Sequence, residues 1–143
     1  INLEKTMSTQ NNDVTITALM MPIGGFPVVT AQTILKEALE EMDKFHLGVA
    51  CVVNNEGHLL GILTDGDIRR KLLSVQKPLS AFFIDDAIKY STPNPVVISP
   101  SNSLYEAHAL MGKKQVWELP VVDNNKLVGL LHLHPVVDAL LNR

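Results

Sequence analysis

The sequence contains one pattern twice. The segment GHLLGILTDGDIRRKLL (57–73) returns as NKLVGLLHLHPVVDALL (125–141), with Gly61 matched by Gly129. Further upstream, Pro-Val-Val at 27–29 returns at 95–97. A repeat of this length indicates supersecondary units that bury their apolar faces against one another, so it constrains the fold more than any single motif does.

Each copy predicts the order strand, helix, strand, strand, helix. In the first copy these elements fall at residues 28–29, 35–42, 49–53, 59–63 and about 68–75. In the second copy they fall at residues 96–98, 104–111, 119–122, 127–131 and from Pro135 onward. Ser103 and Glu106 predict a capping box at the start of the second copy's first helix. The fold class is therefore α/β of the α+β type, with two β-α-β-β-α repeats packed as a pseudo-two-fold pair.

The repeats suggest a simple division of the chain. We expect a polar arm or linker remnant at 1–13, the first repeat at 14–76, a connecting segment at 77–93 with a helix near 84–90, and the second repeat at 94–143. The chain starts at Ile1 without a signal-peptide pattern, and we expect it to be a piece of a longer protein with a catalytic domain upstream.

Composition narrows the class of partner. The 143 residues are 46% hydrophobic and 19% charged, with a formal net charge of −3, which favours neither nucleic acid nor an anionic membrane as a partner. No apolar run is long enough to span a bilayer. Cys51 is the only cysteine and lies within an apolar run, which predicts a buried, inert thiol and a cytoplasmic setting.

The junction after the second strand of the first copy carries the most chemistry. It reads Thr64-Asp65-Gly66-Asp67-Ile68-Arg69-Arg70 and opens a helix, whose free backbone N–H groups and dipole favour an anion. Because cations are disfavoured in a first helical turn, the two arginines imply a bound phosphate or a neighbouring carboxylate that offsets them.

The same junction fits a sugar as well as a phosphate. The Asp67 carboxylate is suited to the paired donors of a vicinal diol, and Thr64 can donate or accept beside it. With an apolar slot lined by Val28, Val29 and the 49–53 strand, these residues predict a nucleotide pocket. The alternative, equally compatible with the heptapeptide, is that Thr64 and Asp67 only cap the helix and the arginines are solvated.

Two further groups of residues suggest enzyme or metal chemistry. Asp65 and Asp67 after an apolar strand are similar to the acidic pair of haloacid-dehalogenase-type phosphatases, with Asp85-Asp86 as a magnesium partner, but the repeat context argues against this enzyme. In the second copy, His132 and His134 alternate along the expected last strand and share a face. Two ligands are too few for a metal site, so the two histidines are expected to be the polar lining of a pocket or to lie at a partly exposed strand end.

The residues resemble a tandem pair of CBS domains over about Thr15 to Asn142, and the pattern Gly-Ile-Leu-Thr-x-x-Asp at 61–67 is the most specific mark of the resemblance. More narrowly, GILTDGDIRR together with LPVVDNNKLVGLLHLH resembles the C-terminal half of bacterial D-arabinose 5-phosphate isomerases. A CBS pair attached to a sugar-phosphate nucleotidylyltransferase is the alternative parent.

The resemblance implies a non-catalytic regulatory module that requires no cofactor. It implies that Thr64 and Asp67 hold a ribose, that the opening of their helix receives phosphate, and that Val28 and Val29 contact a base. The equivalent second-copy positions are His132 and Pro135, which predicts one competent site per chain.

The ligands implied are AMP, ATP or CMP-octulosonate, a sugar nucleotide whose acidic sugar His132 and His134 are suited to line. The partners implied are a sugar isomerase domain of 3-deoxy-manno-octulosonate and lipopolysaccharide synthesis, absent from this chain, and a second copy of the chain. A ligand-free dimerisation module is the second functional hypothesis.

Overall fold

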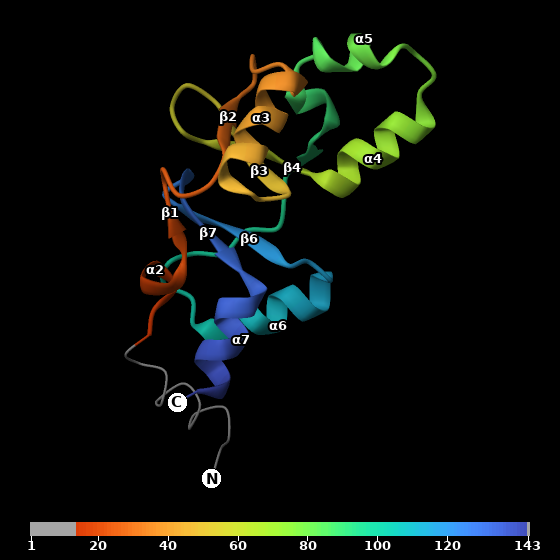
Figure 1. Cartoon of the computed structure of the whole chain (residues 1–143). Coiled ribbons are helices and arrows are strands. Elements are labelled where there is room, and N and C mark those ends of the chain that lie inside the picture. The colour runs from red at the N-terminus through yellow and green to blue at the C-terminus, as the bar shows by residue number, and fades with distance from the viewer. Residues whose placement is uncertain (1–13, 143) are drawn as a thin grey trace. The chain divides into compact units, whose positions relative to one another are not determined.

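The computed structural model describes residues 14–142, so the expected polar arm at 1–13 lies outside the described residues. Their contacts divide them into two compact units (Figure 1). Unit 2 contains residues 23–95 and 125–127, and unit 1 contains residues 14–22, 96–124 and 128–142. Unit 2 therefore consists mainly of residues 23–76 of the first repeat and the connecting segment, and unit 1 consists mainly of the second repeat.

Unit 2 is a four-stranded mixed sheet with helices. The sheet order is β2 (Val28–Thr30), β3 (Val49–Val53), β4 (Leu59–Thr64) and β5 (Thr92–Pro93). β2 runs parallel to β3, and the other two pairs are antiparallel. The helices are α3 (Leu35–Phe45), α4 (Asp65–Ser74), α5 (Leu79–Phe83) and the 3-10 helix η1 (Ala87–Tyr90).

The unit 2 core follows the predicted periodicity. Leu35, Ala38 and Met42 on one face of α3 are buried against alternate residues of the sheet. The members of this core are Val29, Leu35, Ala38, Met42, Ala50, Val52, Leu63, Ile68, Phe82, Ala87 and Tyr90. All five residues of β3 are buried, as the continuous apolar run predicted.

Unit 1 is a three-stranded sheet in the order β1 (Met21–Pro22), β7 (Lys126–His132) and β6 (Glu118–Asp123). Its helices are α2 (Ile16–Leu19), α6 (Leu104–Lys114) and α7 (Leu133–Leu141). Ser103 and Glu106 form the predicted capping box at the start of α6. The helices α3 and α6 end alike, each with a left-handed residue at φ 55°, His46 and Gln115.

Each sheet takes its short edge strand from outside its own repeat. β1 precedes the first repeat's other strands in the chain but pairs with β7, placing Pro22 opposite Gly129. β5 directly precedes the second repeat but pairs with β4, placing Pro93 opposite Gly61. Residues 14–22, expected from sequence to open the first repeat, thus pack with the second.

Three sequence expectations need correction. Residues 96–98 do not form a strand: only Ile98 makes an isolated bridge, to Val121, before the chain turns at residues 99–102. The helix expected near 84–90 is confined to η1, and α5 precedes it. The last helix begins at Leu133 rather than Pro135, and its first turn tolerates Pro135 because the N–H that proline lacks would have no partner within the helix.

No helix in residues 14–142 is both long and apolar enough to cross a membrane.

Candidate functional site

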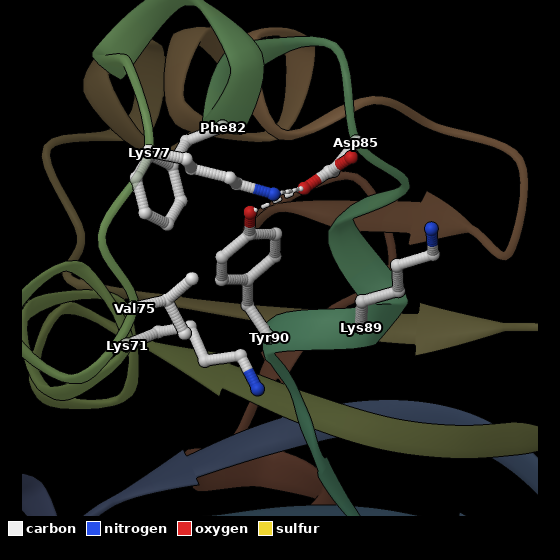
Figure 2. Close-up of a pocket in the computed structure, with 7 residues that line it drawn as sticks. All are labelled: Lys71, Val75, Lys77, Phe82, Asp85, Lys89 and Tyr90. Atoms are coloured by element: carbon white, nitrogen blue, oxygen red, sulfur yellow. Dashed lines mark hydrogen bonds and ion pairs between the residues drawn. The ribbon is translucent and has the colours of Figure 1, made fainter.

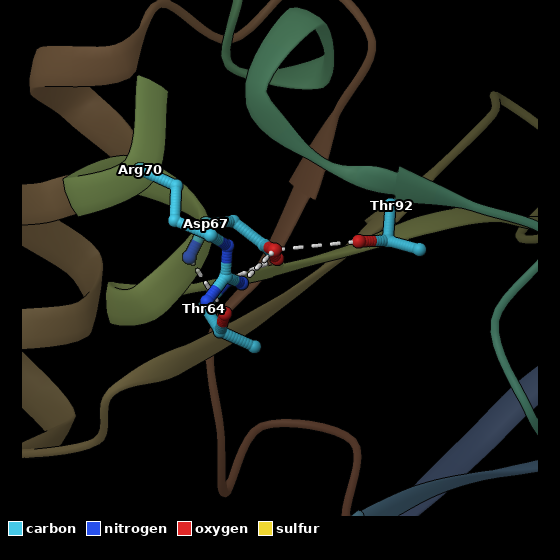
Figure 3. A network of polar contacts seen from close by, with 4 residues as sticks. All are labelled: Thr64, Asp67, Arg70 and Thr92. Carbon is cyan, nitrogen blue, oxygen red and sulfur yellow. Dashed lines mark hydrogen bonds and ion pairs between the residues drawn. The ribbon is translucent and has the colours of Figure 1, made fainter. Parts of the chain in front are cut away.

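The predicted junction forms where β4 ends and α4 begins (Figure 3). The Thr64 hydroxyl oxygen accepts the Asp67 backbone N–H at 3.1 Å, and the Asp67 carboxylate accepts the Thr64 backbone N–H through Oδ2 at 3.2 Å. This is a reciprocal capping box, which satisfies two backbone donors that the start of a helix leaves free. The capping role that the sequence left open is therefore present.

The second oxygen of the Asp67 carboxylate makes tertiary contacts. Its Oδ1 accepts a hydrogen bond from Arg70 Nη2 at 2.8 Å and a longer one, 3.4 Å, from the hydroxyl of Thr92 on β5. Figure 3 shows the carboxylate directed from α4 toward Thr92. The side chain is 15% exposed, so the carboxylate is fixed by its neighbours and is still reachable from solvent.

The two arginines differ in their surroundings. Arg70 is paired with Asp67, so a neighbouring carboxylate offsets its charge, one of the two arrangements that the sequence predicted. Its guanidinium passes over Gly66, where an added Cβ would lie 3.1 Å from Nη1. Arg69, the residue before Arg70 in α4, is exposed.

Asp65 is held by the start of β3. Its backbone N–H donates to the Gly48 carbonyl at 3.0 Å, and its carboxylate covers Gly48 so closely that an added Cβ there would lie 2.5 Å from Oδ2. The absence of a side chain at Gly48 therefore allows Asp65 to turn back over the sheet. This interaction orients the first residue of α4 relative to the sheet.

The register of the sheet separates the two predicted valines. Val28 pairs with Cys51, which pairs with Ile62, and residues in register share a face. Alternation along β4 then puts Thr64 on the same face as Val28. Val29 lies on the opposite face, 4% exposed in the helix-covered core. Of the pair, only the side chain of Val28 is brought to the Thr64 face.

The second repeat has a different junction. His132 occupies the capping position of α7 without a side-chain capping bond, and its Nε2 lies 3.9 Å from Glu118 Oε1. Burial raises the pKa of Glu118, and the nearby His132 partly opposes that shift. Pro135 stands where the first repeat has its diol-binding candidate.

The prediction that His132 and His134 share a strand face is wrong. Because α7 begins at Leu133, His134 is a helical residue, 83% exposed and 3.3 Å from Asp138 one turn later. The helix starts there because the Leu133 N–H bonds the Trp117 carbonyl, as the Asp65 N–H bonds Gly48 in the first repeat.

The phosphatase interpretation requires acidic side chains gathered around a magnesium ion. Among residues 14–142 no three His, Cys, Asp or Glu side chains gather as metal ligands. Asp85, the proposed magnesium partner, instead accepts hydrogen bonds from Lys77 and Tyr90.

Sequence reasoning missed Thr92 and Gly48. Thr92 is far from Asp67 in the chain and lies on a two-residue strand with no periodicity, so no local pattern marks it. The signal for Gly48 was its position one residue before a continuous buried strand, where a glycine often indicates a close approach of backbone.

Comparison with known proteins identifies the repeat. The family model described as the CBS domain matches residues 16–74 and again residues 86–142. The crystal structure of CBSX2 in complex with AMP has a TM-score of 0.76 and 30% identity, covering 89% of this chain and 96% of that one. CBSX2 from Arabidopsis thaliana in a second crystal structure has the same TM-score at 28% identity, covering 89% of this chain and 94% of that one.

Curated relatives are longer. Protein RP505 of Rickettsia prowazekii is 33% identical over 111 residues, 78% of this chain and 33% of that protein. The arabinose 5-phosphate isomerase GutQ of Salmonella typhimurium is 29% identical over 125 residues, 85% of this chain and 36% of that protein. The chain thus spans about a third of the length of these relatives. Both repeats match one model, and the chain belongs to the CBS domain family as a tandem pair.

Proposed function

We propose that this chain is a non-catalytic regulatory module that binds one adenosine nucleotide at the start of α4. The observation that carries the proposal is Asp67, a carboxylate 15% exposed and held toward Thr92 at a strand-to-helix junction. The bond to Thr92 is long, at 3.4 Å, so a ribose diol can replace it without disturbing the capping bond at Oδ2. The AMP complex of CBSX2 supports the choice of an adenosine nucleotide.

The other groups at the junction have matching roles in this proposal. The Asp65 and Asp67 N–H groups already donate to Gly48 and Thr64, so in this proposal the Gly66 backbone N–H and the guanidinium of Arg70 receive the phosphate. Asp65 and Gly66 shape the turn, and Arg69 adds positive charge. Val28 offers an apolar contact to the base from the Thr64 face. His132 and Pro135 lack the paired acceptors for a diol, so the second repeat does not provide an equal site.

The parent protein in this proposal is a cytoplasmic D-arabinose 5-phosphate isomerase that acts in 3-deoxy-manno-octulosonate synthesis. The similarity to GutQ supports this parent, and a pathway product such as CMP-octulosonate is the alternative ligand. Ligand binding changes the activity of an attached domain only if the ligand has different affinity for two arrangements of the protein. Self-association through the module is part of the same proposal.

A ligand-free dimerisation module is the second candidate. It is favoured by the complete pairing of Thr64 with Asp67 in the capping box, which gives both residues a structural role without a ligand. Exposed apolar residues on and after α4, Leu72, Leu73 and Val75, provide a surface for self-association.

Calorimetric titration with AMP, ATP, CMP and CMP-octulosonate separates the two candidates. We expect AMP or ATP to bind with one site per chain. Asp67→Asn keeps an oxygen for the Thr64 N–H but removes the carboxylate, so we expect this variant to fold normally and bind at least about tenfold more weakly. Binding of none of the four ligands, or equal affinity in Asp67→Asn, would overturn the nucleotide proposal.

A further inference from the structure

A second candidate site lies in unit 2 beyond the C-terminal end of α4. A pocket of about 420 Å³ is lined by Lys71, Val75, Lys77, Phe82, Asp85, Lys89 and Tyr90 (Figure 2). Its volume falls within the range of small-molecule sites, roughly 300–1,000 Å³. None of its lining residues belongs to the junction at Thr64, and most come from the segment that joins the two repeats.

One wall of the pocket is fixed by hydrogen bonds and ring contacts. Asp85 Oδ2 accepts from Lys77 Nζ at 2.5 Å and from the Tyr90 hydroxyl at 2.7 Å. The Lys77 ammonium lies 4.7 Å from the centre of the Phe82 ring, which in turn lies 6.0 Å from the Tyr90 ring at an angle of 53°. Phe82 and Tyr90 are both buried. A wall built in this way is ordered before any ligand arrives, which lowers the entropic cost of binding.

The charge balance of the pocket is positive. The hydrogen bond from Lys77 lowers the pKa of Asp85, so the carboxylate is ionised and neutralises that lysine. Burial, with a further contribution from Asp85, raises the pKa of Tyr90 to about 12, so its phenol is neutral. Within residues 14–142, neither Lys71 nor Lys89 forms an ion pair, and both are exposed. Lys89 is still close enough to Asp85 to contribute to the lowering of its pKa. The excess positive charge therefore belongs to the lining as a whole, which has three ammonium groups, Lys71, Lys77 and Lys89, against the one carboxylate of Asp85.

We propose that this pocket binds a small phosphate monoester. A phosphate monoester carries close to two negative charges at neutral pH, which matches the excess of two positive charges in this lining. Its organic part contacts Val75 and the aromatic rings of Phe82 and Tyr90, which form the apolar side of the lining. Figure 2 shows Val75 and Lys71 on one side of the Tyr90 ring and Lys89 on the other.

The test uses phenyl phosphate, a dianion with an aromatic group, and follows backbone amide shifts by NMR. We expect saturable shifts at Val75, Lys77 and Tyr90, and none at these positions with phenol, which lacks the charge. Lys71→Met and Lys89→Met should each weaken binding about fivefold, as expected for loss of a partly exposed ion pair. Lys44→Met removes an exposed lysine from α3 of the same unit and should leave the affinity unchanged.

Asp67→Asn separates this site from the nucleotide site, because it should leave the phenyl phosphate shifts at Val75 and Tyr90 intact. Shifts confined to the start of α4 would overturn the proposal, since phosphate would then bind only there. Unchanged affinity in both Lys71→Met and Lys89→Met, or an equal loss in Lys44→Met, would overturn it as well. Equal binding of phenol would show an apolar cleft without anion recognition and would also contradict the proposal.

Discussion

Gly129 in β7 is paired directly with Pro22 in β1, so closely that a Cβ added to Gly129 would lie 2.9 Å from the Met21 carbonyl oxygen. The side chain of Met20 would obstruct the same methyl group. In the first repeat Gly61 has the same relationship to Pro93, with Ser91 and the Thr92 carbonyl as the close neighbours. In both units, the glycine's lack of a side chain therefore leaves room for the edge strand to pair.

The first prediction concerns this contact. Gly129→Ala should lower the free energy of unfolding by about 1–3 kcal/mol, because the Met21 backbone cannot move aside as a flexible side chain can. Urea denaturation followed by circular dichroism measures the change. Gly112→Ala is the matched control, since its Cβ meets nothing within 4 Å and it lies in α6, where alanine should stabilise by about 0.5–1 kcal/mol. Equal effects of the two substitutions would contradict the packing argument.

The second prediction separates capping from ligand binding. Thr64→Ala and Ser103→Ala each remove the capping residue of a capping box, so each should cost about 1 kcal/mol of stability. Only Thr64→Ala should reduce the affinity for AMP, because Ser103 lies at the start of α6. Thermal unfolding and calorimetric titration of both variants provide the readouts. A similar loss of AMP affinity in both variants would show that lower stability, and not the loss of a ligand contact at Thr64, weakens AMP binding.

The third prediction concerns the ionisation of Tyr90. Its pKa is raised from 10.0 to about 12, so the stabilisation from the neutral phenol is complete below about pH 10 and is lost as the pH rises through about 12. Asp85 contributes at the acidic end of the pH range. The pKa of its carboxyl is lowered, so the stabilisation from the ionised carboxylate is present above pH 3.8, the ordinary pKa, and is lost as the pH falls through the lowered pKa.

Tyrosinate absorbance measures this directly, because the chain has only two tyrosines. The step near pH 12 should be absent in Tyr90→Phe and retained in Tyr105→Phe. At pH 7, Tyr90→Phe should lower the free energy of unfolding by about 1–2 kcal/mol through the lost hydrogen bond to Asp85. Persistence of the step in Tyr90→Phe would show that Tyr90 is not its source.

The fourth prediction tests the membership of residues 14–22 in unit 1. Ile16 is 0% exposed in the unit 1 core, so Ile16→Ala should cost about 2–4 kcal/mol of that unit's stability. Ile23→Ala, at a residue 55% exposed, should change stability by less than about 0.5 kcal/mol. Hydrogen exchange should show lost protection first in β6 and β7 in Ile16→Ala. An equal loss in β3 would show that the two units open together.

Periodicity explains why the long elements could be predicted from the sequence. The helical stripe of Leu35, Ala38 and Met42 buries one face of α3, whereas the continuous apolar run of β3 is buried on both faces of the sheet. Each sequence pattern follows from that burial. The capping box at Ser103 was predicted because its partner is three residues away in the chain, and capping by Thr64 and Asp67, at the same spacing, was one of two alternatives left open.

The remaining features depend on contacts between distant residues. The two-residue edge strands end in proline and have no alternation, so their pairing with Gly61 and Gly129 left no local signal. His134 was misassigned because a backbone bond to Trp117, across the sheet, starts α7 earlier than the sequence indicated. Strand alternation alone puts Val28 and Val29 on opposite faces, but which of the two shares the face of Thr64 depends on the register with β3 and β4, which the sequence did not contain.

The membership of β1 in unit 1 has a consequence for any enzyme fused ahead of residue 14. Such an enzyme would be tethered to the unit of the second repeat, whereas Thr64 and Asp67 belong to the other unit. The enzyme would therefore be joined to the unit that does not contain the proposed nucleotide site. Communication between such a nucleotide and such an enzyme would have to pass from one unit to the other, which the chain connects at residues 22–23, 95–96, 124–125 and 127–128. A change in chain length at 22–23 or 95–96 should therefore uncouple them.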